Sequence, residues 1–534
     1  EQDQLPRWID FRYFMRSRVW SQFFVDWTDM MRVAIPDART GRVGHDHHDF
    51  SRYHEQMTSS KLYIGQSPLP EWREAMVAEL PQSFSGDKGF YLAPQSTIRW
   101  TYDLQSKINR ERWPWLTLIL GLNGFDWENG LAGPTLGGMS GFTPCYSEAL
   151  PFFKDMAREV QAIQRGIGKL TIAADPHRSD VAILWSPRNH YLSRCLPFEE
   201  NGFSGTFLSN IVTHGGAPAD CLALLNSLRI RPTFIAPEDL AAGGFKALLL
   251  PYNKAMSPAE AKAIRQFVHD GGLVIADNEP GSFTEHGRAL GEKRRLAELF
   301  PDFTDSTLIE HGAGRAAYLP NGLNGYVEKH GSGDFAQAEP VQRLLAEFAD
   351  QRPPIELLDA AGKPRRDIFA RVFNVDEVRL FGLLRAAIDD GSQNQKTSMI
   401  LPEKAHVWDV REHEYLGFGD RFELSLDLRP RFFAILKSNP EAIDLRLASK
   451  ATPGALLKIQ GKVQDATGKQ TVHLRVFDSK GSELEWFRRN ELFDGAKFEI
   501  NLPLSFSLTP DIYEIQAQHA ITGARANVKF TIQP

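Results

Sequence analysis

Residues 257–277, SPAEAKAIRQFVHDGGLVIAD, decide the fold of the middle of this chain. The stretch begins as a capped helix, with Ser257 at the N-cap and Glu260 completing a capping box. Gly271 and Gly272 end the helix, and an apolar strand at 273–276 follows at once. A helix that leads directly into a buried-type strand predicts a doubly wound α/β domain built on a parallel sheet.

Three earlier apolar runs extend this α/β pattern toward the N-terminus. They lie at 181–186, 232–235 and 247–251. We expect the domain to close near Tyr318 and the glycine-rich and polar loops of 320–345 to form a junction.

The first 172 residues also alternate helices with short apolar runs. A helical spacing of apolar residues covers 8–33, and four strands are expected. The strands lie at 42–44, 62–65, 90–93 and 116–122. Such an order predicts a parallel sheet whose working loops follow the carboxyl ends of its strands, and four such units make half of a (β/α)8 TIM barrel.

From about residue 365 onward the pattern is all-β. Short strands at 371–373, 378–384, 406–410 and 432–436 predict a small β domain, and those at 472–477, 497–502, 513–517 and 528–532 predict an immunoglobulin-like sandwich. The expected fold class is therefore α/β plus all-β. The expected domains are 1–172, 173–345, 346–440 and 441–534.

Composition excludes several classes of protein. The 534 residues carry a net charge of −6, which gives no electrostatic footprint for nucleic acid or an anionic membrane. With 42% hydrophobic residues the chain is not disordered, and no apolar run is long enough for a membrane helix. The start Glu1-Gln2 lacks a methionine and a signal sequence, so we expect a fragment or a processed product, and the compartment, cytoplasmic or periplasmic and secreted, stays undecided.

The order of these domains resembles the C-terminal two-thirds of the family 42 β-galactosidases among the glycoside hydrolases. The stretches that carry the resemblance lie at 112–124, 166–186, 271–287 and 407–417, within a similarity that spans about residues 5–437. The resemblance implies strands five to eight of a catalytic barrel, a trimerisation domain and a small β domain. It further implies a homotrimer that needs no cofactor and acts on a carbohydrate with retention of configuration.

The same resemblance implies that the first four barrel strands are missing. A complete barrel needs about 250 residues, and fewer than 180 precede the second domain. In the family the general acid is a Glu that follows Asn at the end of strand four. The pairs Asn278-Glu279 and Asn490-Glu491 fall in other domains, so we interpret both as decoys and place the acid outside this chain.

Two positions compete for the nucleophile, which the family carries at the end of strand seven. If residues 75–78 form that strand, Glu79 sits at its tip as a catalytic carboxylate. If the apolar residues there form a helical stripe instead, the strand is 90–93 and its tip offers Gln95, which cannot attack. A Glu on a helix surface is then the alternative for Glu79.

Polar and aromatic residues follow the predicted strands. Asp126, Trp127 and Glu128 come after the last one, where Glu128 is a candidate catalytic residue and Asp126 and Trp127 are candidate substrate contacts. Trp100 is a further candidate for stacking on a sugar, since eight of the 11 Trp residues lie in the first 130 residues. The alternative is a solvated loop with packing tryptophans.

The cluster His45, Asp46, His47, His48 has three interpretations. His45 and His47 are candidates for contacts to sugar hydroxyls at the tip of strand five. A metal site is the second interpretation, and a polar loop is the third. We predict no metal, because no further Cys or His cluster lies nearby in the sequence.

The doubly wound domain lacks two further chemistries. No GxGxxG motif follows its first strand, which argues against dinucleotide binding. Its likeness to a class I amidotransferase fold would need a Cys after residues 248–250, where Pro251 and Tyr252 stand instead. Cys221 is expected in a helix core. The leading hypothesis is thus a retaining glycoside hydrolase, inactive without the missing barrel half, and the rival is a non-catalytic carbohydrate-binding or oligomerisation scaffold.

Overall fold

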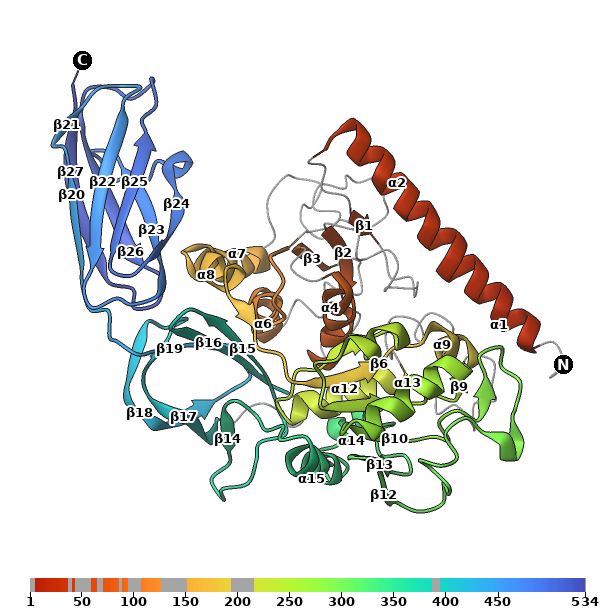
Figure 1. The fold of residues 1–534 in the computed structure, drawn as a ribbon. Helices are drawn as coiled ribbons and strands as arrows, with labels where there is room; N and C mark the ends of the chain where they lie inside the picture. Colours follow the sequence, from red (N-terminus) through yellow and green to blue (C-terminus); the bar gives the residue numbers. More distant parts are fainter. Residues whose placement is uncertain are drawn as a thin grey trace.

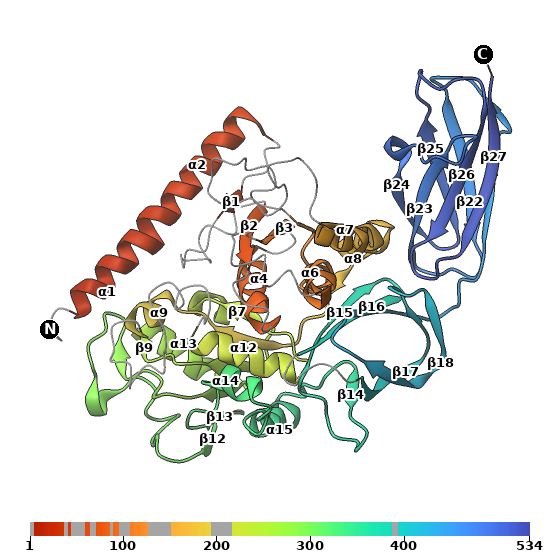
Figure 2. The same cartoon turned by 180° about the vertical axis from the view of Figure 1, so that it is seen from behind.

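The structure, a computed structural model, describes residues 5–36, 41–43, 59–64, 71–85, 89–94, 107–125, 151–193, 216–386 and 394–533. Figures 1 and 2 show four parts, with the two ends of the chain at opposite sides of the molecule. In the described part of the chain, no helix combines the length and the apolar character that a membrane crossing requires.

A long helical segment opens the chain, as the spacing over 8–33 predicts. It consists of α1 (Leu5–Tyr13), the π-helical η2 (Phe14–Trp20) and α2 (Ser21–Ala34). Ile9 is fully buried against Leu192 and Ala255, which anchors the start of the segment on the doubly wound domain. Farther along, large apolar side chains are exposed, among them Phe11, Phe14, Phe23, Met30 and Val33.

Four parallel strands follow, alternating with helices. Their order in the sheet is β1 (Gly41–Val43), β2 (Ser59–Ile64), β3 (Gly89–Pro94), β4 (Gly124–Phe125). Helices α4 (Glu71–Ser85) and α6 (Lys107–Ile119) lie between strands, and α7 (Pro151–Gln164) and α8 (Ile167–Ile172) lead out of this part. The parallel sheet is confirmed, whereas its membership in a barrel stays a prediction.

The strand predicted at 116–122 is wrong. Residues up to Ile119 continue helix α6, and the strand is only the pair Gly124–Phe125. The helix is buried nearly all round, with Trp115 1% and Ile119 0% exposed. A continuous apolar run fits a buried helix as well as a buried strand, so periodicity cannot separate the two.

The doubly wound domain carries a six-stranded sheet. Its order is β12 (Thr307–His311), β13 (Gly314–Tyr318), β10 (Leu273–Ala276), β8 (Ala247–Leu250), β6 (Val181–Leu184), β7 (Thr233–Ile235), with only β12 antiparallel. All four predicted strands are present, and the closing strand ends at Tyr318 as expected.

Helices cover both faces of this sheet (Figure 1). Alternate strand residues such as Ile183 and Leu249 pack toward α12 (Ala217–Ser227) and α15 (Ala338–Phe348), whereas Leu184 and Leu248 pack toward α13 (Pro258–His269). The predicted capping box begins α13: the Glu260 backbone N donates to Ser257 Oγ at 3.1 Å.

Residues 320–345 do not form the expected loop-rich junction. They contain α14 (Tyr326–Gly331) and most of α15, and Tyr326 and Leu345 are fully buried in the core of the doubly wound domain. An apolar stripe at helical spacing, Val341, Leu344 and Leu345, explains why this polar stretch folds as a helix on the sheet.

The next part is a curled β domain (Figure 2). Its sheet runs β14 (Glu356–Leu358), β17 (Gln395–Asp409), β19 (Arg431–Leu436), β16 (Val378–Arg385), β15 (Ile368–Val375), β5 (Asp175–Pro176), and β18 (Glu414–Leu426) pairs with β17. Its predicted strands are confirmed. The edge strand β5 comes from far upstream, so this sheet borrows a strand from the segment that leads into the doubly wound domain.

The last part is a sandwich of two sheets around a core of its own. One sheet is β20 (Ile443–Leu447), β22 (Leu456–Val463), β25 (Lys497–Pro503). The other is β21 (Lys450–Ala451), β27 (Arg525–Ile532), β26 (Ile512–His519), β23 (Lys469–Phe477), β24 (Arg489–Asp494). The four predicted strands are all present, and the immunoglobulin-like topology stays a prediction.

Candidate functional site

The carboxyl ends of strands β1 to β4 define one edge of the N-terminal sheet. All three strand pairs are parallel, with Val43 opposite Lys61, Ile64 opposite Pro94 and Leu92 opposite Phe125. Loops that leave these ends therefore start from a common edge, which is where parallel α/β folds place their ligand sites.

Most residues that the sequence nominates follow these strand ends. His45 and His47 come after Val43, Trp100 after Pro94, and Asp126, Trp127 and Glu128 directly after Phe125. These six residues lie outside the described residues. The topology therefore shows only the strand ends from which their loops start.

Glu79 is described, and its predicted strand-tip position is wrong. It lies in helix α4 and is completely buried. The alternative of a helix-surface Glu is also wrong, because the side chain has no exposed area. A nucleophile must reach its substrate, and this carboxylate faces the protein interior instead.

Three arginines surround the Glu79 carboxylate. Arg231 Nε lies 2.7 Å from Oε1, Arg178 Nη1 lies 3.2 Å from Oε2, and Arg371 donates Nε to Oε1 at 3.2 Å. Burial alone would raise the pKa of Glu79, but the three cations overcome it and lower the pKa to about 2. Glu79 is therefore ionised at neutral pH and links three separate segments of the chain.

No motif in the sequence points to this arginine cluster. Arg371 lies in the middle of strand β15, between the buried residues Ala370 and Val372, and is itself only 2% exposed. A charged residue in the middle of a strand that is apolar apart from Asn374 is the one local signal that could have revealed it, since such residues are rarely buried without a partner.

The helix assignment of α4 separates the two interpretations of this part of the sequence. With α4 helical, the third strand of the sheet is β3, which ends at Pro94. Gln95 follows it in the sequence and lies outside the described residues. The choice between the two interpretations of the sequence is thus settled in favour of the helical one for α4.

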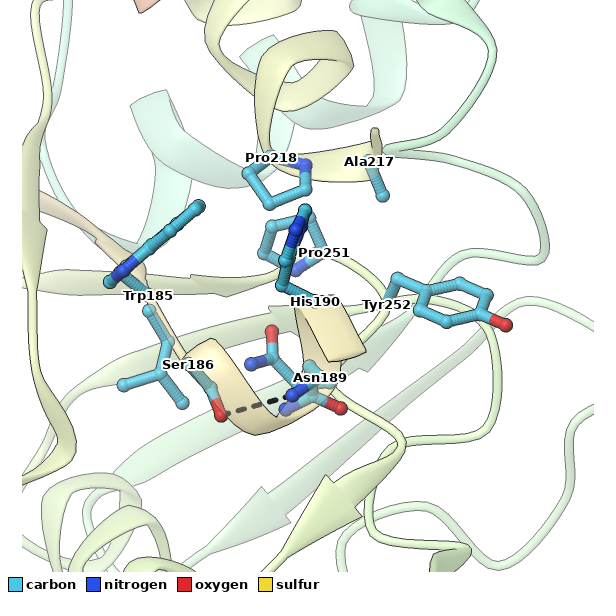
Figure 3. A pocket seen from close by; sticks show the side chains of 10 residues that line it. Trp185, Ser186, Asn189, His190, Ala217, Pro218, Pro251 and Tyr252 are labelled. Carbon is cyan, nitrogen blue, oxygen red and sulfur yellow. Dashed lines mark hydrogen bonds between the residues drawn. The ribbon is translucent and has the colours of Figure 1, made fainter. Parts of the chain in front are cut away.

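A small cavity lies in the doubly wound domain, at the carboxyl ends of β6 and β8. The volume of this cavity is about 30 Å³. Figure 3 shows the rings of Trp185, His190 and Pro251 around it, with Ser186 and Asn189 along one side. The chain leaves β6 toward β7 and leaves β8 toward β10 on the opposite side, so the boundary between β6 and β8 is the topological switch point of the sheet, where such folds bind ligands.

The polar groups around this cavity serve the fold. Asn189 exchanges two hydrogen bonds with the backbone of Ala255, at 2.9 and 2.6 Å, which ties helix α9 (Pro187–Ser193) to β9 (Ala255–Met256). Tyr252 adopts a positive φ of 54°, and its backbone N donates to Asp277 Oδ1 at 3.0 Å. Burial raises the pKa of Asp277 to about 6, although the hydrogen bonds that its carboxylate accepts from the backbone N–H groups of Tyr252 and Leu323 act in the opposite direction.

The described residues that line this cavity include no cysteine. Tyr252 stands at the strand-to-helix turn where an amidotransferase needs a thiol, and Cys221 is fully buried in α12, as predicted. The two Asn-Glu pairs are also placed as predicted: Asn278-Glu279 follows β10, and Asn490-Glu491 lies in β24. Among the described residues, no three His, Cys, Asp or Glu side chains gather as a metal site.

Comparison with known proteins finds matches among solved structures, whereas no family model and no curated protein matches. A β-galactosidase from Bacillus circulans sp. alkalophilus overlaps 76% of this chain, with a TM-score of 0.55 and 12% identity. A GH42 β-galactosidase from G. stearothermophilus overlaps 78%, with a TM-score of 0.55 and 14% identity. The GH42 exo-carrageenase from Bacteroides ovatus overlaps 81%, with a TM-score of 0.52 and 14% identity.

These matches confirm the resemblance at the level of the fold: the chain has a GH42-like architecture. It spans 65%, 66% and 56% of the length of the three solved proteins, respectively.

Proposed function

We propose that this chain is part of a retaining glycoside hydrolase that cleaves β-glycosidic bonds, as the β-galactosidases of family 42 do. The single observation that carries the proposal is the shared fold over more than three quarters of the chain. The parallel sheet supports it, because its strand ends bring the loops with the nominated polar and aromatic residues to one edge.

In this proposal the substrate binds at that edge. Retaining hydrolysis needs two carboxyl groups about 5 Å apart, one as acid and one as nucleophile. Glu128 supplies one carboxyl group, and His45, His47, Trp100, Asp126 and Trp127 bind the sugar. Glu79 has no part in the chemistry, because its carboxylate is buried and neutralised by arginines.

The general acid and the remaining barrel strands come from a further polypeptide segment. The exposed apolar side chains on α1 and α2 support this, because so many on one helical segment mark an interface rather than a solvated surface. In a complete barrel such a helix would pack on strands that the described sheet does not contain.

A non-catalytic carbohydrate-binding scaffold is the second candidate function. The observation that favours it is the position of β3, because the residue after this strand is Gln95 and an amide cannot act as a nucleophile. Such a protein would keep the sugar contacts of the edge and bind without turnover.

Hydrolysis of nitrophenyl β-D-galactoside by the whole protein that carries this chain tests the proposal. Glu128→Gln is expected to lower kcat at least about 100-fold, because an amide cannot replace the carboxylate that attacks the sugar. Glu403→Gln, on the exposed side of β17, is the matched control and should leave kcat unchanged. Galactoside binding without hydrolysis in the wild type would select the scaffold, and turnover unaffected by Glu128→Gln would refute the assignment.

The doubly wound domain is proposed to assemble three copies of the protein, as the resemblance implies. Light scattering should then give a mass of three times that of the whole polypeptide. A monomeric mass, near 60.2 kDa for the present chain, would contradict the assembly without bearing on catalysis.

A further inference from the structure

A small cavity with strongly cationic walls lies where three parts of the molecule meet. Arg229 and Arg231 reach it from the segment between α12 and β7, Arg371 from β15 of the β domain, and His177 from the segment after β5. Its other walls are proline and apolar side chains. None of the residues that line it, all of them in the described part of the chain, is acidic.

The charges around the cavity do not balance. Glu79 contacts Arg178, Arg231 and Arg371, so one carboxylate faces three guanidiniums. Arg229, which is 7% exposed, adds a fourth guanidinium, and the acidic groups that favour its charge are Glu356 and Asp367. Asp367 is itself engaged by Arg365. Buried charges are costly without a partner, so the excess positive charge calls for an anion.

Two buried N–H groups of the cavity arginines lack acceptors. Arg231 Nη1 and Arg229 Nε have no hydrogen-bond partner among the described residues. Buried side-chain donors are normally paired, and each exception requires an explanation. The unpaired donors belong to the same two guanidiniums that line the cavity.

The remaining donors of these arginines hold the guanidiniums in place. Arg231 Nη2 donates to Gln82 Oε1 at 2.8 Å, Arg371 Nη2 to Asn226 Oδ1 at 2.8 Å, and Arg229 Nη1 to the Arg365 carbonyl at 2.7 Å. Because each guanidinium is fixed by a contact outside the cavity, the free donors are preorganised and need not reorient to meet a ligand.

We propose that this cavity binds one small monovalent anion of the size of chloride, held between Arg229 and Arg231. The size of the cavity limits the ligand. Its volume is only about 10 Å³, which is enough for roughly one particle of about the size of a water molecule. A phosphate or a carboxylate has several heavy atoms and does not fit without rearrangement of the walls.

The anion has a structural consequence. Arg231 belongs to the doubly wound domain, Arg371 to the β domain, and both grip Glu79 of the N-terminal part. Neutralising the surplus charge there strengthens a junction of three domains, so anion binding stabilises the molecule as a whole. Anion binding in this cavity does not depend on glycosidase activity.

Bromide replaces chloride in such sites and scatters X-rays anomalously, which gives a direct test. Crystals of the protein soaked in sodium bromide should show an anomalous peak within hydrogen-bond distance of Arg229 Nε and Arg231 Nη1. Water density or an occluded cavity at this place in the wild type would overturn the proposal, whatever the activity of the protein.

Thermal unfolding provides the test in solution. Sodium bromide at 100 mM should raise Tm by roughly 2–4 °C over sodium gluconate at equal ionic strength. The difference should vanish in Arg229→Gln and persist in Arg265→Gln, which changes a partly exposed arginine on α13. Equal Tm values in the two salts for the wild type would contradict the proposal, and so would an undiminished difference in Arg229→Gln. If Arg229→Gln fails to fold, the anomalous map of the wild type decides alone.

Discussion

Arg231 Nε lies 2.7 Å from Glu79 Oε1, and this ion pair joins the doubly wound domain to helix α4 of the N-terminal part. Both side chains are almost entirely shielded from solvent. A carboxylate that the sequence nominates as a nucleophile therefore acts as the neutralising centre of a domain junction.

Replacing Glu79 by Gln should destabilise the protein by about 3–5 kcal/mol, because it leaves three arginines without their common counter-ion. Chemical denaturation measures the free energy of unfolding. Glu403→Gln, an exposed substitution, should change this free energy by no more than about 0.5 kcal/mol. A loss below about 1 kcal/mol for Glu79→Gln would show that the cluster contributes little.

The same variant bears on catalysis. If the whole protein hydrolyses a glycoside, the kcat of correctly folded Glu79→Gln should equal that of the wild type, because the carboxylate has no exposed surface to offer a substrate. Active-site titration of the folded fraction separates kcat from stability. A loss of kcat in folded molecules would restore Glu79 as a catalytic residue.

His519 should make the stability of the sandwich depend on pH. Burial, with a smaller contribution from nearby His413, lowers the pKa of His519 to about 3. The unfolded chain binds this proton below about pH 6.5, so protonation favours unfolding. The stabilisation is complete above pH 6.5 and is lost as the pH falls toward 3.

The corresponding measurement is the free energy of unfolding between pH 7 and pH 4.5. In His519→Gln its slope should be smaller than in the wild type by about 1.4 kcal/mol per pH unit, the value for one proton. His269→Gln, which replaces an exposed histidine, is the control and should keep the wild-type slope. Identical slopes in wild type and His519→Gln would argue against a buried neutral imidazole.

Arg411→Lys should lower the free energy of unfolding by about 1.5–3 kcal/mol, the range for loss of a hydrogen bond to a charged group. The Arg411 guanidinium grips both oxygens of Glu159 on α7, with Nη2 to Oε1 at 2.9 Å and Nε to Oε2 at 3.2 Å. An ammonium cannot reproduce this paired geometry. Arg421→Lys, in an exposed ion pair, should cost less than about 1 kcal/mol. Equal losses in the two variants, measured by urea denaturation, would contradict a special role for Arg411.

Gly382→Ala should destabilise the contact between β16 and helix α6 by about 1–3 kcal/mol. A Cβ at this position would lie 2.5 Å from Ile119 Cγ1 and 2.9 Å from Phe432 Cδ2. Gly331→Ala meets no atom within 4 Å and should be neutral or slightly stabilising at the end of α14. Differential scanning calorimetry of the pair gives the comparison, and equal Tm values would mean that Ile119 and Phe432 move aside without cost.

Local patterns were sufficient for much of the fold. The strand at 273–276 and the helix before it could be read directly, because caps, glycines and apolar periodicity are encoded within a few residues. The alternating strands of the sandwich and the parallel order of the N-terminal sheet followed in the same way. The stretch 407–417, part of the resemblance to family 42, includes Arg411, whose contacts with α7 only the structure revealed.

By itself, therefore, the sequence determined the order and type of most elements and the strand ends that the nominated site residues follow along the chain. Only the tertiary structure decided that 116–119 is helix and that Glu79 is a buried counter-ion. The physical reason is distance along the chain: Glu79 meets Arg231 and Arg371, and the latter is 292 positions away. Local propensity carries no information about a charge that remote segments neutralise. The role of Glu79 as a counter-ion is therefore set only when three domains pack together.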